Sequence, residues 1–589
     1  MPNGRNLDVA VVGSPSTSAE LTLDILQEAT EERLLGALVA FNATQSGVPI
    51  TSVGQVVSIK LQNRWHEDSV FRNLVKRTGE IPPITNRQDT RTATLAVGAT
   101  FSLRDGRSEP DVLGMVPPTG TRVCRVDQAL LDSLLSSYQS EIFYLGRAYA
   151  NDVLFPMWLK HFGSGPGGAG EAYHGGVFGK TGSGKSGLAK MILLGYARHK
   201  QMGILVIDPQ GEFSLELSGT RVGQQGLPMD EVLRAMGRPV QRYRIENLQL
   251  DEWDTFEELL VALEFTAQLG IPVASVNNAT QAASAICDAV EGRYRLDQLA
   301  SEDALRSALA AVTTNANAQL VYATAGRRQQ FVTFVQGILQ DNTRLQAVFR
   351  GSWQPLASLF VPGPGRRTLY GIIQDLLVVG QDGTTAIRPA VVIDISQQGN
   401  RKFWTEGLQK RLLAKLLGLL VDFATRTLST RESANVLVLL DEAHRHAPGG
   451  PIDESDPEGR RLRTLLRQAV RETRKYGVGW FFISQTLGGI DREILQQLRI
   501  EFFGFGLALG DEFHKLREFA GGDDRAMELY QSFRDPQSFP RRDLQEFPFM
   551  AVGPASPLAF SGKPLFFSTF VDPQEFLREN NLPGRQGIR

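Results

Sequence analysis

The chain has 589 residues, of which 42% are apolar and 21% are charged. This composition is that of a soluble globular protein with several structural units, and it excludes disordered and fibrous classes. No apolar run is long enough to span a bilayer and the first residues lack a secretory signal, so we expect a cytoplasmic protein without a membrane contact. A formal net charge of -2 means that any DNA contact must come from local basic surfaces. The two cysteines, Cys124 and Cys287, are far apart and form no metal or redox motif.

Residues 1–125 consist of short β-rich runs separated by Gly, Pro, Asn and Asp, for example 36–41, 54–59 and 92–98. Strands at this density, without long helices, predict a small β-barrel or sandwich. We expect this unit to serve in assembly or docking rather than as a second active site.

Residues 126–216 are expected to form the first part of an α/β core. Leucines at helical spacing predict helix between 127 and 159, and a buried-type strand at 203–208 ends in Asp208. A carboxylate at that position would lie at the ligand edge of an open α/β sheet, although it could equally start the turn at Pro209.

A phosphate-binding loop follows the apolar residues Val177 and Phe178 and opens a helical pattern. In such a loop the glycines let backbone amides surround phosphates, the lysine reaches the β- and γ-phosphates, and the hydroxyl ligates Mg²⁺. The spacing G-x-x-x-x-G-K-[ST] is met by Gly179, Lys180, Thr181, Gly182, Ser183, Gly184, Lys185 and Ser186.

Residues 217–367 show helical periodicity without a phosphate or metal motif, which predicts a helical bundle inserted into the core. The core is expected to resume over 368–538, where a buried-type strand at 435–440 ends in Asp441 and Glu442. Together with the upstream loop, this pair has the Walker B form, in which the first carboxylate holds Mg²⁺ and the second activates water. Two solubilising residues at a strand end are the alternative.

Five arginines lie on one face of the helix that is predicted after the Walker B strand. A solvated face is the ordinary interpretation, but arginine without lysine favours contact with phosphates or other planar anions. Their positions are Arg460, Arg463, Arg467, Arg471 and Arg474.

A further buried strand at 479–486 carries Gln485 near its end, where an amide could bond the γ-phosphate or the attacking water, or simply belong to a turn. Strands and helices thus alternate as a parallel sheet requires. The tail at 539–589 is rich in Pro and Phe and poor in predicted helix, and we expect an extended arm that packs over a neighbouring subunit or over its own core.

These motifs together resemble the HerA family, in the HerA/FtsK superfamily of hexameric DNA-translocating ATPases, in its bacterial form. The likeness covers most of the chain and is strongest over 145–213 and 390–509. It is carried by His174 ahead of the phosphate loop, the strand end at 208–212, the box at 441–444, and the segments at 471–477 and 483–486.

The resemblance implies a RecA-like P-loop core with an N-terminal HAS-barrel, an inserted helical bundle and a C-terminal arm that braces the adjacent subunit. It also implies a homohexamer that uses ATP and Mg²⁺ to move along double-stranded DNA, with a NurA-type nuclease as partner in DNA end resection and double-strand break repair.

Carried over by motif, Lys185 and Glu442 would be catalytic and Gln485 the sensor. The loop residues and Asp208 would bind nucleotide, and Ser186 and Asp441 would bind Mg²⁺.

An arginine between 471 and 475 would act on the neighbouring subunit's γ-phosphate. Arg474 is favoured over Arg471, but Thr473 stands where the family often has Gly, so the register is open. Candidates for DNA contact are Arg401, Lys402, Arg445 and His446.

Three other functions are compatible with parts of the pattern. A DNA or protein pump of the conjugation or secretion type would need a membrane anchor. A non-translocating ring scaffold for a nuclease would not need the intact Walker residues. A small-molecule kinase would not need the Walker B glutamate.

Overall fold

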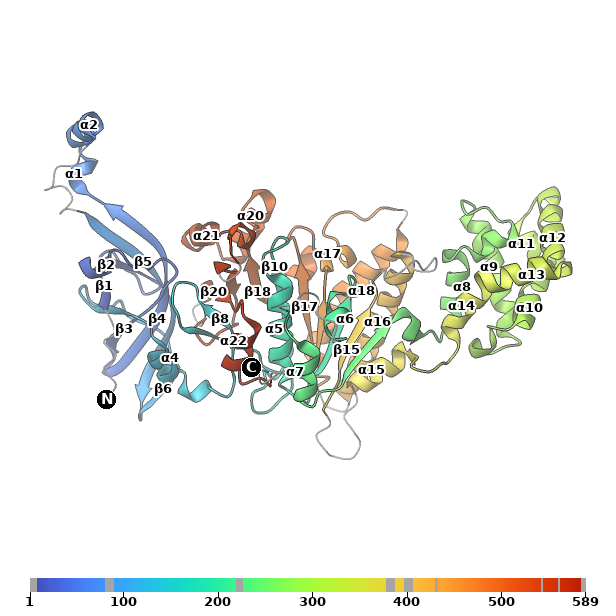
Figure 1. Ribbon diagram of the computed structural model, residues 1–589, viewed down its shortest axis with the longest axis horizontal. Coiled ribbons are helices and arrows are strands. Elements are labelled where there is room, and N and C mark those ends of the chain that lie inside the picture. The colour runs from blue at the N-terminus through green and yellow to red at the C-terminus, as the bar shows by residue number, and fades with distance from the viewer. Residues whose placement is uncertain are drawn as a thin grey trace.

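The computed structural model describes residues 8–79, 89–218, 226–377, 387–396, 406–429, 433–454, 456–541, 544–559 and 562–583. Three parts follow one another along the long axis of the molecule (Figure 1). A β-barrel occupies one end, an α/β core the middle, and a helical bundle the other end. Among the described residues, no helix combines the length and the apolar character needed to cross a membrane.

The N-terminal part is a closed barrel, which confirms one of the two predicted forms. Its sheet has the order β2-β1-β7-β3-β4-β5-β6, and β2 also pairs with β5, so six strands close while β6 stays outside. Beyond the barrel, β4 and β5 continue as a ribbon that carries α1 and α2 (Figure 1). The elements are β1 (Asp8–Val12), β2 (Glu20–Ile25), β3 (Leu38–Gln45), β4 (Val48–Gln62), α1 (Arg64–Glu67), α2 (Ser69–Thr78), β5 (Thr90–Arg104), β6 (Arg107–Asp111) and β7 (Arg122–Arg125).

The core is one sheet of eleven strands in the order β12-β15-β11-β16-β17-β10-β18-β19-β20-β8-β9. The run from β12 to β18 is parallel and the remaining strands are antiparallel. This is a RecA-like P-loop core, as predicted. Its strands are β8 (Ile142–Ala148), β9 (Leu154–Trp158), β10 (His174–Phe178), β11 (Gly203–Asp208), β12 (Val240–Arg244), β15 (Ala390–Asp394), β16 (Val436–Leu440), β17 (Val478–Ser484), β18 (Leu498–Gly504), β19 (Pro548–Val552) and β20 (Leu565–Thr569).

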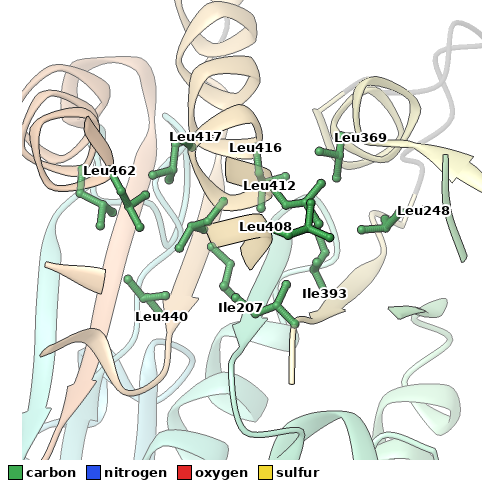
Figure 2. Close-up of a cluster of buried hydrophobic side chains, with 14 of the residues drawn as sticks. Ile207, Leu248, Leu369, Ile393, Leu408, Leu412, Leu416, Leu417, Leu440 and Leu462 are labelled. Atoms are coloured by element: carbon green, nitrogen blue, oxygen red, sulfur yellow. The ribbon is translucent and has the colours of Figure 1, made fainter. Parts of the chain in front are cut away.

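Helices pack on the sheet through leucines at helical spacing. Figure 2 shows the leucines of α16, among them Leu408 and Leu412, lying over Ile207, Ile393 and Leu440 at the carboxyl ends of the central strands. The core helices are α4 (Gln128–Leu134), α5 (Lys185–Ala197), α6 (Glu212–Glu216), α7 (Met229–Ala235), α15 (Leu369–Leu377), α16 (Glu406–Ser429), α17 (Ala443–His446), α18 (Pro457–Thr473), α19 (Arg492–Leu495), α20 (Gly510–Phe519), α21 (Asp524–Gln531) and α22 (Pro573–Glu579).

The bundle is built around Trp353, whose ring is fully buried and whose Nε1 donates to the Leu299 carbonyl at 2.7 Å. The chain passes from the core to the bundle and later returns. At these two places the short strands β13 (Leu248–Gln249) and β14 (Arg367–Thr368) pair in parallel. The helices of the bundle are α8 (Trp253–Ala262), α9 (Val276–Glu291), α10 (Glu302–Val312), α11 (Asn315–Val321), α12 (Ala325–Gln340), α13 (Asn342–Val348) and α14 (Gln354–Ala357).

One predicted helical stretch and one predicted boundary differ from the structure. Between 127 and 159 only α4 follows the leucine spacing, and the rest forms β8 and β9, in which buried side chains come from both faces of the sheet. The predicted bundle at 217–367 includes β12, which belongs to the core because it pairs in parallel with β15.

The C-terminal segment packs on the core of its own chain, one of the two expected placements, but it does so as the strands β19 and β20 of the core sheet. It also anchors the barrel. The fully buried amide of Gln55 in β4 donates to the Phe566 carbonyl at 2.8 Å and accepts from the Phe566 amide at 2.8 Å.

Glu501 lies within β18, between Gly176 of β10 and Val552 of β19. Its side chain is buried, and burial raises the pKa of the carboxyl to about 8. Because this folded-state pKa exceeds the value of the unfolded chain, the associated stability is present below about pH 4.5 and is lost as pH rises through 8.

Glu501→Gln is therefore expected to stabilise the protein at alkaline pH. The gain should grow from near zero at pH 4.5 to about 4 kcal/mol at pH 8. Unfolding midpoints measured across this pH range test the expectation, with Glu493→Gln, whose side chain is 58% exposed, as the matched control. A gain that does not change with pH would contradict it.

Candidate active site

The phosphate loop connects β10 to α5, as the motif predicts. Gly179, Gly182 and Gly184 have φ of 154°, 84° and 90°, a region that side chains disfavour, so the glycines are required by the backbone path. Lys185 is the first residue of α5 and its Nζ donates to the Lys180 carbonyl at 3.0 Å. The amides of the helix start thus face the same space as the lysine.

A pocket of about 570 Å³ opens over this loop. Three further segments border it: the turn after β11, the ends of β16 and β17, and the C-terminal segment. Its lining comprises Thr181, Gly182, Gly184, Lys185, Ser186, Gly187, Gln210, Glu212, Asp441, Glu442, Ile483, Gln485, Pro536, Gln537, Gln545, Phe547 and Val571. The sequence motifs at Lys185, Asp441 and Gln485 therefore meet in one place.

Asp441 follows β16, which is separated from the loop strand β10 by β17 alone. Burial, together with the nearby charges of Glu442, Asp208 and Glu212, raises the pKa of Asp441 to about 7. Burial also lowers the pKa of Lys185 despite the attraction of these carboxylates. The site therefore concentrates negative charge that a cation would stabilise.

Glu442 has φ 47° and ψ 41°, a left-handed conformation that is strained for a residue other than Gly. Its Oε1 accepts from Gln485 Nε2 at 3.0 Å, and its Oε2 lies 3.3 Å from His444 Nε2. Gln485 Oε1 in turn accepts from the Thr181 hydroxyl at 3.1 Å. The carboxylate is thus linked through Gln485 to the phosphate loop.

Glu212, which no prediction included, is a further carboxylate of this site. Its Oε2 accepts from the Ser186 hydroxyl at 3.2 Å, and its Oε1 pairs with Lys190 Nζ at 2.6 Å. The sequence feature that could have identified Glu212 is its position in the turn directly after the strand that ends in Asp208.

The oxygen donors Ser186, Asp441 and Glu212 fit Mg²⁺, which prefers few protein ligands and keeps several waters.

Asp208 differs from its predicted role. It is fully buried, and its two carboxylate oxygens accept from the amides of Gly211 at 2.8 Å and Ser214 at 2.7 Å. Burial raises its pKa to about 6, despite these bonds. Asp208 does not line the pocket, and its bonds hold the turn that presents Glu212.

The arginine face of α18 divides into two groups. Arg463 donates to the Gly450 carbonyl, and Arg467 pairs with Asp491 and Glu493, so these side chains have structural partners within the chain. The Arg460 guanidinium likewise donates to the Glu454 carbonyl at 3.0 Å.

Arg471 and Arg474 are more available, with 66% and 53% of their side chains exposed. Their ion pairs, to Glu472 at 3.6 Å and to Glu171 at 3.8 Å, are long. Neither arginine lines the pocket of its own chain, so a phosphate contact would have to be made to another subunit.

The structure gives different results for the four residues that were predicted to contact DNA. Arg401 and Lys402 lie outside the described residues. Arg445 is 57% exposed on α17, with its Nε 3.9 Å from Glu442 Oε2. His446 is buried, with a pKa lowered to about 4 by burial, so it has no surface for DNA and the expected contact there is wrong.

Several solved structures share part of the fold. VirB4 of Thermoanaerobacter pseudethanolicus is 12% identical, with a TM-score of 0.36, over 74% of this chain and 97% of that chain. The genome packaging NTPase B204 of Sulfolobus turreted icosahedral virus 2, with AMPPCP, is 9% identical, with a TM-score of 0.27, over 68% and 98%. The plasmid coupling protein TrwB, with GDPNP, is 11% identical, with a TM-score of 0.33, over 70% and 87%.

A comparison with curated protein sequences gave no match. Residues 172–350 match the family described as "Helicase HerA, central domain". This range contains the phosphate loop, the strand that ends in Asp208 and most of the helical bundle. The resemblance to HerA that the motifs indicate is therefore confirmed in this central part of the chain.

Proposed function

We propose that the protein is an ATP-driven translocase of double-stranded DNA that works as a ring of six subunits. The observation that carries the proposal is the single pocket in which the phosphate-loop Lys185 meets Asp441, Glu442 and Gln485 at the carboxyl edge of a RecA-like sheet. The HerA match over residues 172–350 supports the translocase class.

In this proposal the loop amides and Lys185 bind the phosphates of ATP. Ser186 and Asp441 would hold Mg²⁺, which when bound neutralises phosphate charge. Glu442, buried beside the loop, accepts the proton of the attacking water, and Gln485 fixes the direction of its carboxylate. Together these groups assign hydrolysis, rather than transfer to a second substrate, to the site.

The ring is proposed because neither Arg471 nor Arg474 lines the pocket of its own chain. Arg474, with Arg471 as the alternative, would reach the γ-phosphate bound by the neighbouring subunit, where such a group stabilises the transition state. Each site would then be complete only in the assembly.

Movement along DNA needs contacts that ignore sequence, and phosphate contacts have this property. Arg445, exposed next to the Walker B pair, would connect hydrolysis with such a contact, and Arg401 and Lys402 are further candidates. A NurA-type nuclease in DNA end resection and double-strand break repair is the proposed partner, on the resemblance to HerA. The barrel would be its docking module.

The test is steady-state ATP hydrolysis with and without linear double-stranded DNA. We expect stimulation by DNA in the intact protein and no turnover in Lys185→Ala, which removes the phosphate contact and controls for contaminating ATPase. If the intact protein hydrolyses ATP at the same rate with and without DNA at low salt, and Lys185→Ala does not hydrolyse it, the result would contradict the DNA translocase and favour a secretion-type pump. Absence of turnover would favour the ring scaffold.

A further inference from the structure

One wall of the pocket comes from the C-terminal segment, which carries no phosphate motif. Gln537, Gln545, Phe547 and Val571 line the cavity from this side. Gln537 and Phe547 approach the phosphate loop closely. A Cβ at Gly182 would lie 2.3 Å from Gln537 Nε2, and one at Gly184 would lie 2.8 Å from Phe547 Cδ1. The segment therefore lies directly against the loop.

The chemistry of this wall differs from that of the Walker residues. Glu442 reaches the loop at Thr181 through Gln485, whereas Phe547 meets it at Gly184, beside the start of α5. Phe547 is only partly buried, and Val571 is 43% exposed. Phosphate and Mg²⁺ make no use of exposed apolar side chains, so this part of the cavity suits another part of the ligand.

Backbone pairing holds the two apolar residues near each other. The Thr569 amide, at the end of β20, donates to the Phe547 carbonyl at 3.0 Å, and Val571 follows two residues later. Phe547 directly precedes β19 and Val571 lies two residues after β20, and both strands belong to the sheet that also contains β10, the strand before the phosphate loop. Sites on strands hold their geometry better than sites on free loops.

We propose that the nucleoside half of ATP lies against this wall, with the base on the ring of Phe547 and Val571 at its border. A phosphate loop holds the α- and β-phosphates, so the sugar and base leave it on the side of the helix start, where Phe547 lies. Gln545 offers an amide that can bond a polar edge of the base. A volume of about 570 Å³ is sufficient for a whole nucleotide.

This inference deepens the proposed function and depends on ATP binding at the loop. It assigns to the chain's own tail a role in nucleotide selection, in place of the expected brace on a neighbour. The phosphates and the base are thus bound by different segments of the same chain, which allows the two contributions to be measured separately.

The experiment is equilibrium dialysis of labelled ATP, with inorganic tripolyphosphate as a competitor that lacks the base. Phe547→Ala is expected to weaken ATP binding about 5- to 100-fold, the effect of losing one base–aromatic stack, while the affinity for tripolyphosphate stays unchanged. Val571→Trp adds bulk at an exposed position without removing buried atoms, and it should weaken ATP binding in the same selective way.

Phe539→Ala is the matched control, because this phenylalanine belongs to the same segment but lines a different cavity with Arg33 and Tyr149. Lys185→Ala should lose both ligands. Unchanged ATP affinity in both wall variants overturns the inference, and so does an equal loss of ATP and tripolyphosphate. If the intact protein binds neither ligand, the proposed function itself fails.

Discussion

Glu442→Gln is expected to lower the rate of ATP hydrolysis by about 10²- to 10⁴-fold, the usual contribution of a general base, while ATP and DNA binding persist. Glutamine keeps the shape of the side chain and can still bond Gln485, but it cannot accept a proton from water. The variant should therefore trap the ATP-bound state. Single-turnover hydrolysis and filter binding of DNA, measured on the same preparation, separate the two effects.

Two further variants serve as comparisons for Glu442→Gln. Glu493→Gln makes the same chemical change at an exposed carboxylate outside the pocket and should keep full turnover. Gln485→Ala removes the bond that orients the carboxylate, so it should reduce kcat less than Glu442→Gln does. Normal turnover in Glu442→Gln would show that another group accepts the proton.

Arg474→Ala is expected to reduce turnover by about 10³- to 10⁵-fold, as in other enzymes that use an arginine finger. The residue is 53% exposed and holds only a 3.8 Å ion pair to Glu171, so its loss should not disturb folding. ATP affinity should change far less than kcat, because the finger acts mainly in the transition state. Turnover and ATP binding measured together provide this comparison.

Mixing two inactive proteins tests whether the arginine acts between subunits. A ring of Lys185→Ala and Arg474→Ala subunits contains some pockets with an intact lysine from one subunit and an intact arginine from the next, so activity should return on mixing. Arg471 lies three residues before Arg474 on the same arginine face. A ring of Lys185→Ala and Arg471→Ala subunits is therefore the matched comparison. No recovery in either mixture would contradict an arginine finger.

The parts of the site that the sequence predicted are those whose chemistry is local. Eight consecutive residues define the phosphate loop, and a strand that ends in Asp441 and Glu442 defines the Walker B pair, so neighbours in sequence are sufficient to recognise them. Their meeting in one pocket follows from parallel strands, whose carboxyl ends share one edge.

What was missed depends on contacts between distant segments. A strand-end aspartate can face a ligand or cap its own turn, and only the buried bonds of Asp208 decide between them. His446 follows the exposed Arg445 directly, yet it is buried, because successive side chains of a helix point about 100° apart. The Pro and Phe content of the tail suggested an irregular arm, although the short apolar runs of β19 and β20 are typical of buried strands.

The bonds between Gln55 and Phe566 connect the barrel directly to the strand that ends beside the pocket wall. Phe566 lies in β20, and Val571 of the pocket wall lies just past the end of the same strand. If the wall shifts when nucleotide binds, β20 and its two bonds to Gln55 would carry that shift toward the barrel, where a docked protein would be exposed to it.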